Sequence, residues 1–201
     1  FRGADGLYIN GKPFGDKLMG VNRHQDYAYI GNAVPNNLHW LDVKKMRDAG
    51  FRIIRSAHYP QDPAFMDACD ELGMFIIVAT PGWQYWNPEP VFEERILSDI
   101  RNMVRRDRNH PSVLLWEPVL NETAFPESFA QNAYRATHEE YPAPGCYAAI
   151  DDKSKGAMGY DVVYTAPKNE AFYRNAGKSC FTREYGDCVD DWNSHNSYSR
   201  V

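Results

Sequence analysis

The 201-residue sequence has few cysteines and no long apolar run. Its four cysteines lie far apart and form no C-x-x-C pair, so neither a zinc site nor a disulfide framework is indicated. No apolar stretch approaches the roughly 20 residues of a membrane-spanning helix, and residues 1–20 lack the charged-then-apolar pattern of a signal peptide. We therefore expect no membrane partner.

Two other features are also missing from the sequence. No G-x-G-x-x-G or G-x-x-x-x-G-K-[ST] loop occurs, which disfavours a nucleotide-binding fold. The formal net charge is -5, and acidic and basic residues are mixed without the basic stripe of a nucleic-acid-binding protein. We expect no nucleic-acid partner. The composition, 43% hydrophobic and 14% aromatic, suits a folded globular body.

Short apolar runs follow an opening hairpin. In residues 1–16, "GADGLYINGKPF" predicts two strands joined at Asn10-Gly11, a pair that tolerates the positive φ angles of a tight turn. Seven further strands are predicted at residues 18–21, 52–57, 74–79, 112–116, 146–150, 161–164 and 180–182. Short buried strands that alternate with helices favour parallel pairing, which fits an open doubly wound sheet or a closed barrel.

Helical periodicity lies between the early strands. The clearest stripe comprises Phe92, Ile96, Ile100, Met103 and Val104. Two earlier faces comprise Leu38, Leu41, Met46 and Ala49, and then Phe65, Cys69 and Leu72. Asp62-Pro63 marks a helix start, while Gly50 and Gly73 mark helix ends. Another helix is expected over residues 129–140, and shorter ones around Lys153 and Glu170.

Several predicted strands end in polar residues. The endings are Asn22-Arg23-His24, Arg55-Ser56-Ala57-His58, Asn121-Glu122 and Arg183-Glu184-Tyr185-Gly186-Asp187. In a parallel barrel the active site lies at the carboxyl ends of the strands, so these residues would meet at one mouth.

These stretches, in this order, resemble the catalytic barrel of family 2 glycoside hydrolases. The matching segments are "DGLYINGKPF", "GVNRH", "RSAHYPQDPAFMDACDELG", "RRDRNHPSVLLW", "NE" and "REYG". The resemblance implies a (β/α)8 TIM barrel, an α/β fold, of which about seven strands are covered. Residues 17–201 would then be a barrel domain lacking its last strand, and the hairpin of residues 1–16 would join an upstream β-sandwich.

The resemblance also implies site roles. Glu122 would be the general acid/base, Glu184 the nucleophile, and Asn121 a hydrogen-bonding partner of the sugar 2-hydroxyl, while His24 and His58 would line the sugar pocket. Two carboxylates are what a retaining glycosidase needs, one to protonate the leaving oxygen and one to attack the anomeric carbon.

Arginines are expected next to these carboxylates. Arg55 lies in an apolar run, and a buried arginine is costly unless it is paired, so we expect a carboxylate partner. Either Arg55 or Arg183 could hold Glu184 ionised. Glu117 is interpreted as a structural residue or as one that supports the site residues without touching the sugar.

Aromatic residues offer further candidates. "PGWQYWNPEP" places Trp83, Tyr85 and Trp86 in a loop, where they could form walls for sugar rings or pack in the core, and we select Trp83 for the wall. Tyr164 ends a strand and could contact the sugar or pack as a core ring. By resemblance, Asp187 stands where many galactosidases place a sugar-contacting histidine, which leaves the sugar open.

The expected function is a retaining hydrolase of terminal β-linked sugars, most like a β-galactosidase. The alternatives are β-glucuronidase-like or β-mannosidase-like specificity, or a non-catalytic carbohydrate-binding barrel fragment. The acidic and histidine-containing stretch that holds magnesium in related galactosidases is replaced by "VATPGWQYWN". We expect no such metal and no organic cofactor. The oligomeric state and the cellular compartment stay open.

Overall fold

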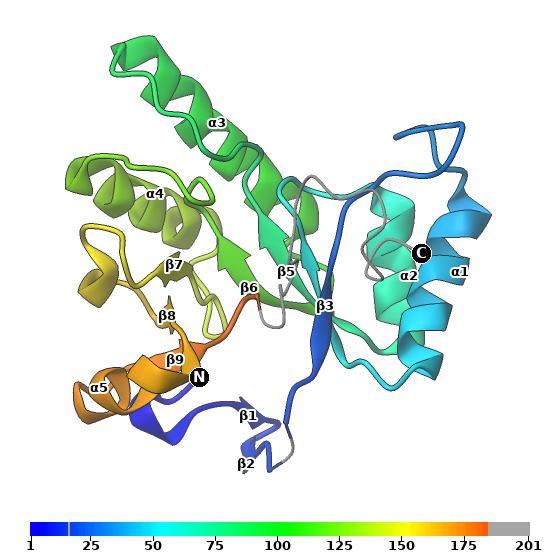
Figure 1. Cartoon of the computed structure of the whole chain (residues 1–201), viewed down its shortest axis with the longest axis horizontal. Coiled ribbons are helices and arrows are strands. Elements are labelled where there is room, and N and C mark those ends of the chain that lie inside the picture. Colours follow the sequence, from blue (N-terminus) through cyan, green and yellow to red (C-terminus); the bar gives the residue numbers. More distant parts are fainter. Residues whose placement is uncertain (16, 185–201) are drawn as a thin grey trace, which may run out of the picture.

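The computed structural model describes residues 1–15 and 17–184. Seven parallel strands follow one another around a curved sheet, and helices cover its outer side (Figure 1). The first four strands pair in chain order: β3 (Gly20–Arg23), β4 (Ile53–Ser56), β5 (Phe75–Ala79) and β6 (Val113–Glu117). The last three also pair in order: β7 (Ala149–Asp151), β8 (Val162–Tyr164) and β9 (Ser179–Phe181).

The two sets of strands are joined between β6 and β7. Trp116 forms a parallel bridge with Ala148, and the Trp116 backbone N–H donates to the Tyr147 carbonyl at 2.9 Å. The seven strands therefore have the order of consecutive strands in a TIM barrel, as predicted. Each predicted strand is present, with its observed limits shifted by up to three residues.

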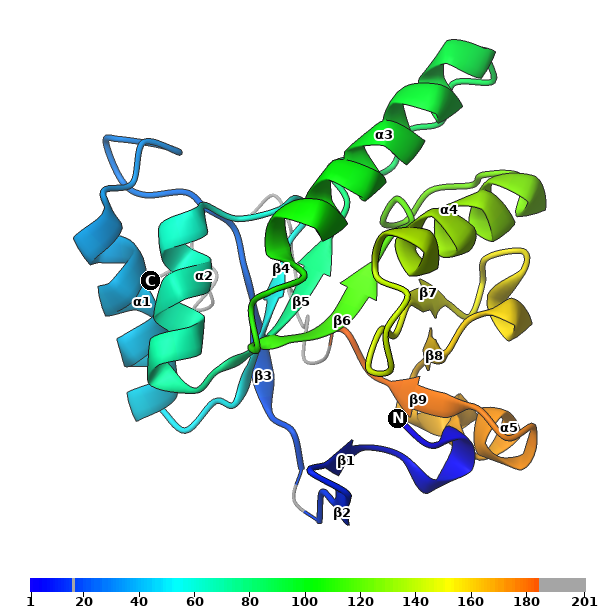
Figure 2. The same cartoon turned by 180° about the vertical axis from the view of Figure 1, so that it is seen from behind.

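Four longer helices lie outside the sheet (Figure 2). They are α1 (Asn36–Asp48), α2 (Pro63–Leu72), α3 (Pro90–Asp107) and α4 (Glu127–Glu140). The Asp62 carboxylate accepts from the Ala64 N–H at 2.8 Å and caps α2, whose end is the left-handed Gly73 at φ 68°. Between the last strands lie shorter elements, namely η2 (Ala157–Gly159), η3 (Pro167–Asn169) and α5 (Glu170–Asn175).

The buried face of α1 differs in part from the predicted one, because Met46 packs against the core as predicted but Leu41 does not. Leu41 is 37% exposed, and the helix buries His39 and Val43 instead. The reason lies in β3, where the buried Arg23 guanidinium donates to Asp42 at 2.9 Å and lies 3.2 Å from His39 Nδ1. Satisfying this charge turns the polar residues of α1 toward the sheet.

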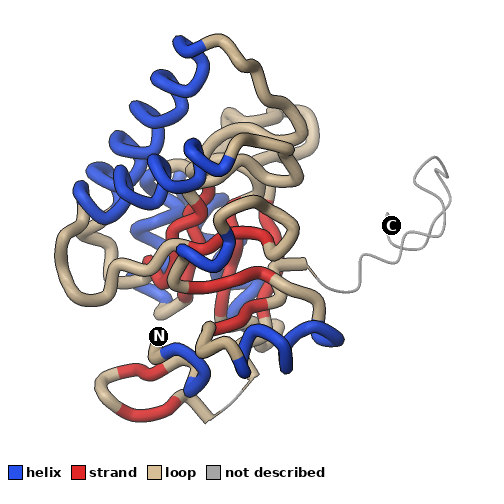
Figure 3. Tube along the Cα trace, turned by 90° about the vertical axis from the view of Figure 1, so that its left-hand side faces the viewer, coloured by secondary structure: helices blue, strands red, loops and turns tan. Residues whose placement is uncertain are grey.

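The N-terminal segment packs against the last strands. It contains η1 (Gly3–Asp5) and the predicted hairpin, β1 (Tyr8–Ile9) with β2 (Lys12–Pro13). The Ser179 hydroxyl donates to the Gly3 carbonyl at 2.5 Å, and the Phe1 ring meets Tyr147 edge-on at 5.2 Å. The view in Figure 3 shows the hairpin below the strands. That it joins an upstream β-sandwich stays a prediction.

The inner face of the sheet changes from apolar to charged along the strands. Ile53, Ile77 and Leu115 belong to one buried cluster inside the curve of the sheet. Side chains two residues apart on a strand point to the same face. Arg55 therefore shares the face of Ile53 on β4, and Glu117 shares the face of Leu115 on β6. The apolar layer thus supports a charged layer toward the carboxyl ends of the strands.

Among the described residues no helix is long and apolar enough to span a membrane. Cys69 and Cys146 are buried free thiols and Cys180 is a partly exposed one, and Cys188 lies outside the described residues. Burial raises the pKa of Cys69 to about 12, so this thiol stays protonated and packs as an apolar group.

Candidate active site

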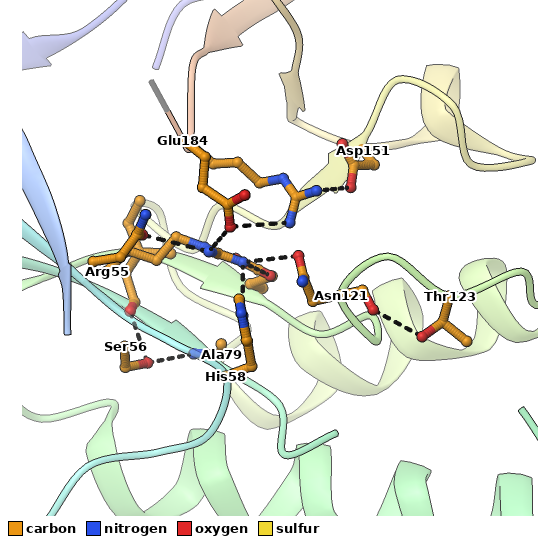
Figure 4. A network of polar contacts seen from close by, with 12 residues as sticks. Arg55, Ser56, His58, Ala79, Asn121, Thr123, Asp151 and Glu184 are labelled. Atoms are coloured by element: carbon orange, nitrogen blue, oxygen red, sulfur yellow. Dashed lines mark hydrogen bonds and ion pairs between the residues drawn. The ribbon is translucent and has the colours of Figure 1, made fainter. Parts of the chain in front are cut away.

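Arg55 is the centre of a polar network at the carboxyl ends of the strands (Figure 4). Its side chain is 3% exposed, and the carboxylate of Glu117 is 2% exposed. Arg55 Nε donates to Glu117 Oε2 at 2.6 Å, and Nη2 donates to Glu117 Oε1 at 2.5 Å. Although burial opposes its charge, the Glu117 carboxylate raises the pKa of Arg55. The expected carboxylate partner of Arg55 is therefore present.

Glu184 reaches the same guanidinium from the end of β9. Arg55 Nη1 donates to Glu184 Oε1 at 2.9 Å, and Arg183 Nη1 lies 3.7 Å from the same oxygen. Arg183 is itself held by Asp151, with Nη2 2.7 Å from Oδ2. Both arginines named from the sequence thus lie beside Glu184. Arg55 makes the closer contact (Figure 4).

Asn121 and Glu122 follow β6. Asn121 is buried, and its Oδ1 accepts from Arg55 Nη2 at 3.2 Å. Glu122 has the left-handed φ of 47° and an exposed side chain, whose Oε2 accepts from Gln84 Nε2 at 2.7 Å. The Gln84 N–H also donates to the Asn121 carbonyl at 3.0 Å. Through Gln84, the loop that follows β5 therefore fixes the position of the loop that carries Glu122. Glu184, in contrast, is positioned by the two arginines.

Two histidines and a tryptophan lie beside this network. The His24 and His58 rings meet edge-on with centroids 5.5 Å apart, and the His58 and Trp83 centroids are 5.6 Å apart. Trp83 is 46% exposed, as a sugar platform requires. Burial, and then the charge of Arg55, lowers the pKa of His58, so its imidazole is neutral at pH 7.

The remaining candidates have different positions. Tyr164 is 2% exposed and packs in the inner apolar cluster, and its hydroxyl has no hydrogen-bond partner among the described residues. Trp86 packs against Phe129, with ring centroids 4.8 Å apart. Asp187 lies outside the described residues. Within residues 1–15 and 17–184, no three His, Cys, Asp or Glu side chains form a group that could hold a metal ion.

Sequence reasoning missed Asp151 and Gln84. Asp151 ends β7, so the rule that selected the other polar strand ends would also have found it. Burial raises the pKa of Asp151, and the charge of Arg183, whose Nη2 lies 2.7 Å from Oδ2, opposes this rise. Gln84 carries no comparable signal, because its contact with Glu122 depends on how two loops pack.

This geometry brings one arginine-held carboxylate to the strand ends that also present Asn121 and the loop of Glu122. A carboxylate held by hydrogen bonds from a guanidinium has a fixed orientation, which suits attack on an electrophilic carbon. An exposed carboxyl group on a neighbouring loop can exchange protons with bound substrate and with water.

Comparison with known proteins gives a consistent result. The family profile described as "Glycosyl hydrolases family 2, TIM barrel domain" matches residues 3–140. A β-galactosidase from Thermoanaerobacterium thermosulfurigenes is 39% identical over 140 residues, which are 69% of this chain and 19% of that protein. The chain thus spans about a fifth of the length of these curated β-galactosidase relatives.

Solved structures agree in fold. A β-glycosidase from Bacteroides vulgatus has a TM-score of 0.70 at 28% identity, covering 90% of this chain and 24% of that one. A β-glucuronidase from Bacteroides uniformis has a TM-score of 0.68 at 27% identity, covering 81% of this chain and 22% of that one.

Proposed function

Because the chain belongs to the TIM-barrel domain of glycosyl hydrolase family 2, we propose that it is the catalytic barrel of a retaining β-glycosidase with β-galactosidase-like specificity. Glu184 is the nucleophile and Glu122 the general acid/base. The observation that carries the proposal is the 2.9 Å contact between Arg55 Nη1 and Glu184 Oε1. Through this contact Glu184, which lies outside the residues 3–140 matched by the family profile, lies at the same strand ends as Asn121 and Glu122.

The proposed reaction has two displacements. Glu184 attacks the anomeric carbon while Glu122 protonates the departing oxygen, and a covalent glycosyl-enzyme forms. Glu122 then takes a proton from water, which attacks the same carbon and releases Glu184. This course requires carboxyl groups about 5 to 5.5 Å apart. Asn121 binds the sugar 2-hydroxyl, and Trp83, His24 and His58 flank the sugar ring.

The test uses the whole protein that contains this barrel, assayed on aryl β-galactosides, β-glucuronides and β-mannosides. Glu184→Gln should lower kcat by at least about 10³-fold on the preferred sugar, because no covalent intermediate can form. Glu122→Gln should also lower kcat, and azide, which needs no general base, should restore turnover of an activated aryl glycoside. Glu71→Gln, on the exposed face of α2, is the control.

Unchanged turnover in both active-site variants would reject the proposal. The panel also decides the sugar, since β-glucuronidases are among the structural relatives. A preference for glucuronides over galactosides would leave the proposed retaining mechanism standing and would change the proposed specificity to that of a β-glucuronidase.

A second candidate is a non-catalytic carbohydrate-binding barrel. The observation that favours it is the exposed aromatic pair Trp83 and Tyr85, at 46% and 60%, next to an exposed Glu122. Saturable glycoside binding without turnover, lost in Trp83→Ala and kept in Glu184→Gln, would select this function.

A further inference from the structure

Glu117 is a buried carboxylate with no part in the proposed reaction. It ends β6, five residues before Glu122, and is 2% exposed. Both of its oxygens accept from Arg55, at 2.6 and 2.5 Å. Burying a carboxylate is costly, and two charge-assisted hydrogen bonds to one guanidinium are the arrangement that offsets this cost most fully.

The bidentate contact fixes the direction of the rest of the guanidinium. The guanidinium is planar and rigid, so holding its Nε and Nη2 edge determines where Nη1 points. Nη1 donates to Glu184 Oε1 at 2.9 Å. The Asn22 and Asn121 amide oxygens accept from the same guanidinium at the longer distances of 3.4 and 3.2 Å.

Other charged groups nearby have their own partners or no charge. Asp151 pairs with Arg183 at 2.7 Å, and His58 is kept neutral by burial and by the Arg55 charge. Among the described residues, Glu117 and Glu184 are therefore the two carboxylates in direct contact with Arg55. Glu117 is the more deeply buried of them, since Glu184 is 27% exposed.

We propose that Glu117 is a positioning residue, which holds Arg55 in the one orientation that presents Nη1 to Glu184. This inference rests on the proposed role of Glu184 as the nucleophile. Glu117 does not touch the sugar. It acts through Arg55, so that Glu184 stays oriented while the glycosidic bond is broken.

The experiment measures kcat, KM and the thermal midpoint of the whole protein on its preferred aryl glycoside. Glu117→Gln should lower kcat about 10- to 100-fold with KM within about threefold, because a misplaced group costs transition-state stabilisation more than substrate binding. Glu117→Asp keeps the charge on a shorter side chain and should recover part of the loss.

The matched control is Asp107→Asn. Asp107 is fully buried at the end of α3 and accepts two hydrogen bonds from Arg106, at 2.7 and 2.8 Å, away from the site. Glu117→Gln and Asp107→Asn each remove a buried carboxylate that accepts two hydrogen bonds from one arginine. We expect a similar fall in the thermal midpoint for both, and a kcat within about twofold of wild type for Asp107→Asn alone.

A double-mutant cycle with Arg55→Lys tests the route of the effect. A lysine cannot bond both carboxylates through a rigid fork, so Glu117→Gln should add less than about twofold to the kcat loss of Arg55→Lys. Multiplicative losses would overturn the inference, as would a Glu117→Gln kcat equal to that of Asp107→Asn.

The outcomes separate the two proposals. If Glu184→Gln is inactive while Glu117→Gln has wild-type kcat, the positioning role fails and the proposed function stands. If Glu184→Gln is active, the proposed function itself fails. Should Glu117→Gln not fold, Glu117→Asp decides: a kcat at least about threefold below wild type supports the positioning role, and a wild-type kcat rejects it.

Discussion

Residues 20–140 and residues 149–184 build the same parallel sheet with different connections. The first region joins its strands through helices of 10 to 18 residues. The second uses three-residue strands, two short 3-10 turns and the six-residue α5. The family profile matches residues 3–140, so it covers the first region and ends at its last residue.

The second region depends on the first through α4. The Tyr160 hydroxyl donates to the Ala130 carbonyl at 2.7 Å. Asp161 accepts from the Tyr134 hydroxyl and lies 3.0 Å from His138 Nε2. The candidate site nevertheless needs both regions, because Arg55 and Glu117 come from the first and Glu184 comes from the second. We therefore expect the first region, with its longer helices, to carry more of the stability, while the residues of the candidate site are divided between the two regions.

The largest expected difference between the regions is in core packing. Phe65 on α2 is fully buried, so Phe65→Ala should lower the free energy of unfolding by about 4 kcal/mol. Phe172 on α5 is 67% exposed, and Phe172→Ala should change it by less than about 0.5 kcal/mol. Urea unfolding of both variants tests this, and equal losses would remove the asymmetry.

A second prediction tests whether the short region contributes to the site. Arg183→Gln leaves the partly buried Asp151 without its cation and removes a charge 3.7 Å from Glu184. We therefore expect kcat to fall about 30-fold, or about 2 kcal/mol. Arg174→Gln, which removes an exposed ion pair with Glu170 on α5, is the control and should retain wild-type kcat. Equal kcat values for Arg183→Gln and Arg174→Gln would show that Arg183 contributes nothing to the site.

A third prediction concerns the contact that joins the regions. The hydrogen bond to Asp161 raises the pKa of His138 from 6.5 to about 9. The raised pKa means that its stabilisation is complete below about pH 6.5 and is lost between about pH 6.5 and 9. Over this range wild type should lose about 1 to 2 kcal/mol of unfolding free energy that His138→Gln does not lose.

Tyr134→Phe is the control for that pH dependence. It removes the other side-chain hydrogen bond to Asp161, and the Tyr134 pKa of about 12 lies above the tested range. Its stability should therefore fall equally at pH 6.5 and pH 9. A parallel pH dependence of wild type and His138→Gln, measured by urea unfolding, would contradict the role of the ion pair.

The smallest expected effect is at the start of α2. Asp62→Ala removes the cap on the Ala64 N–H and should cost about 1 kcal/mol. Asp67→Ala on the exposed face of the same helix should cost less than about 0.5 kcal/mol. A loss for Asp67→Ala as large as that for Asp62→Ala would mean that the cap contributes nothing specific.

The sequence predicted the fold because each strand and long helix carries a local signal. The apolar runs, the Asn10-Gly11 turn and the Asp62 and Gly73 helix ends are confirmed. The predicted face of α1 was wrong at Leu41, because Arg23, which lies on another element, determines which residues turn inward. Local periodicity cannot report such a contact.

The site was predictable in part for the same reason. The need of Arg55 for a carboxylate follows from its own surroundings in the sequence, but the identity of the partner does not. Glu117 and Glu184 lie 62 and 129 residues away, and their contacts depend on the register of the sheet. The proposed roles of Glu122 and Glu184 stay predictions until turnover is measured.

The hydrogen bond from Ser179 to Gly3 joins residues 176 positions apart. During synthesis, the strands that carry Arg55 and Glu117 leave the ribosome long before the segment that carries Glu184. The buried ion pair can therefore form in a nascent chain that still lacks its proposed nucleophile. The candidate site would then be completed only after β9 has been made and has met the segment around Gly3, which is made before either partner of the ion pair.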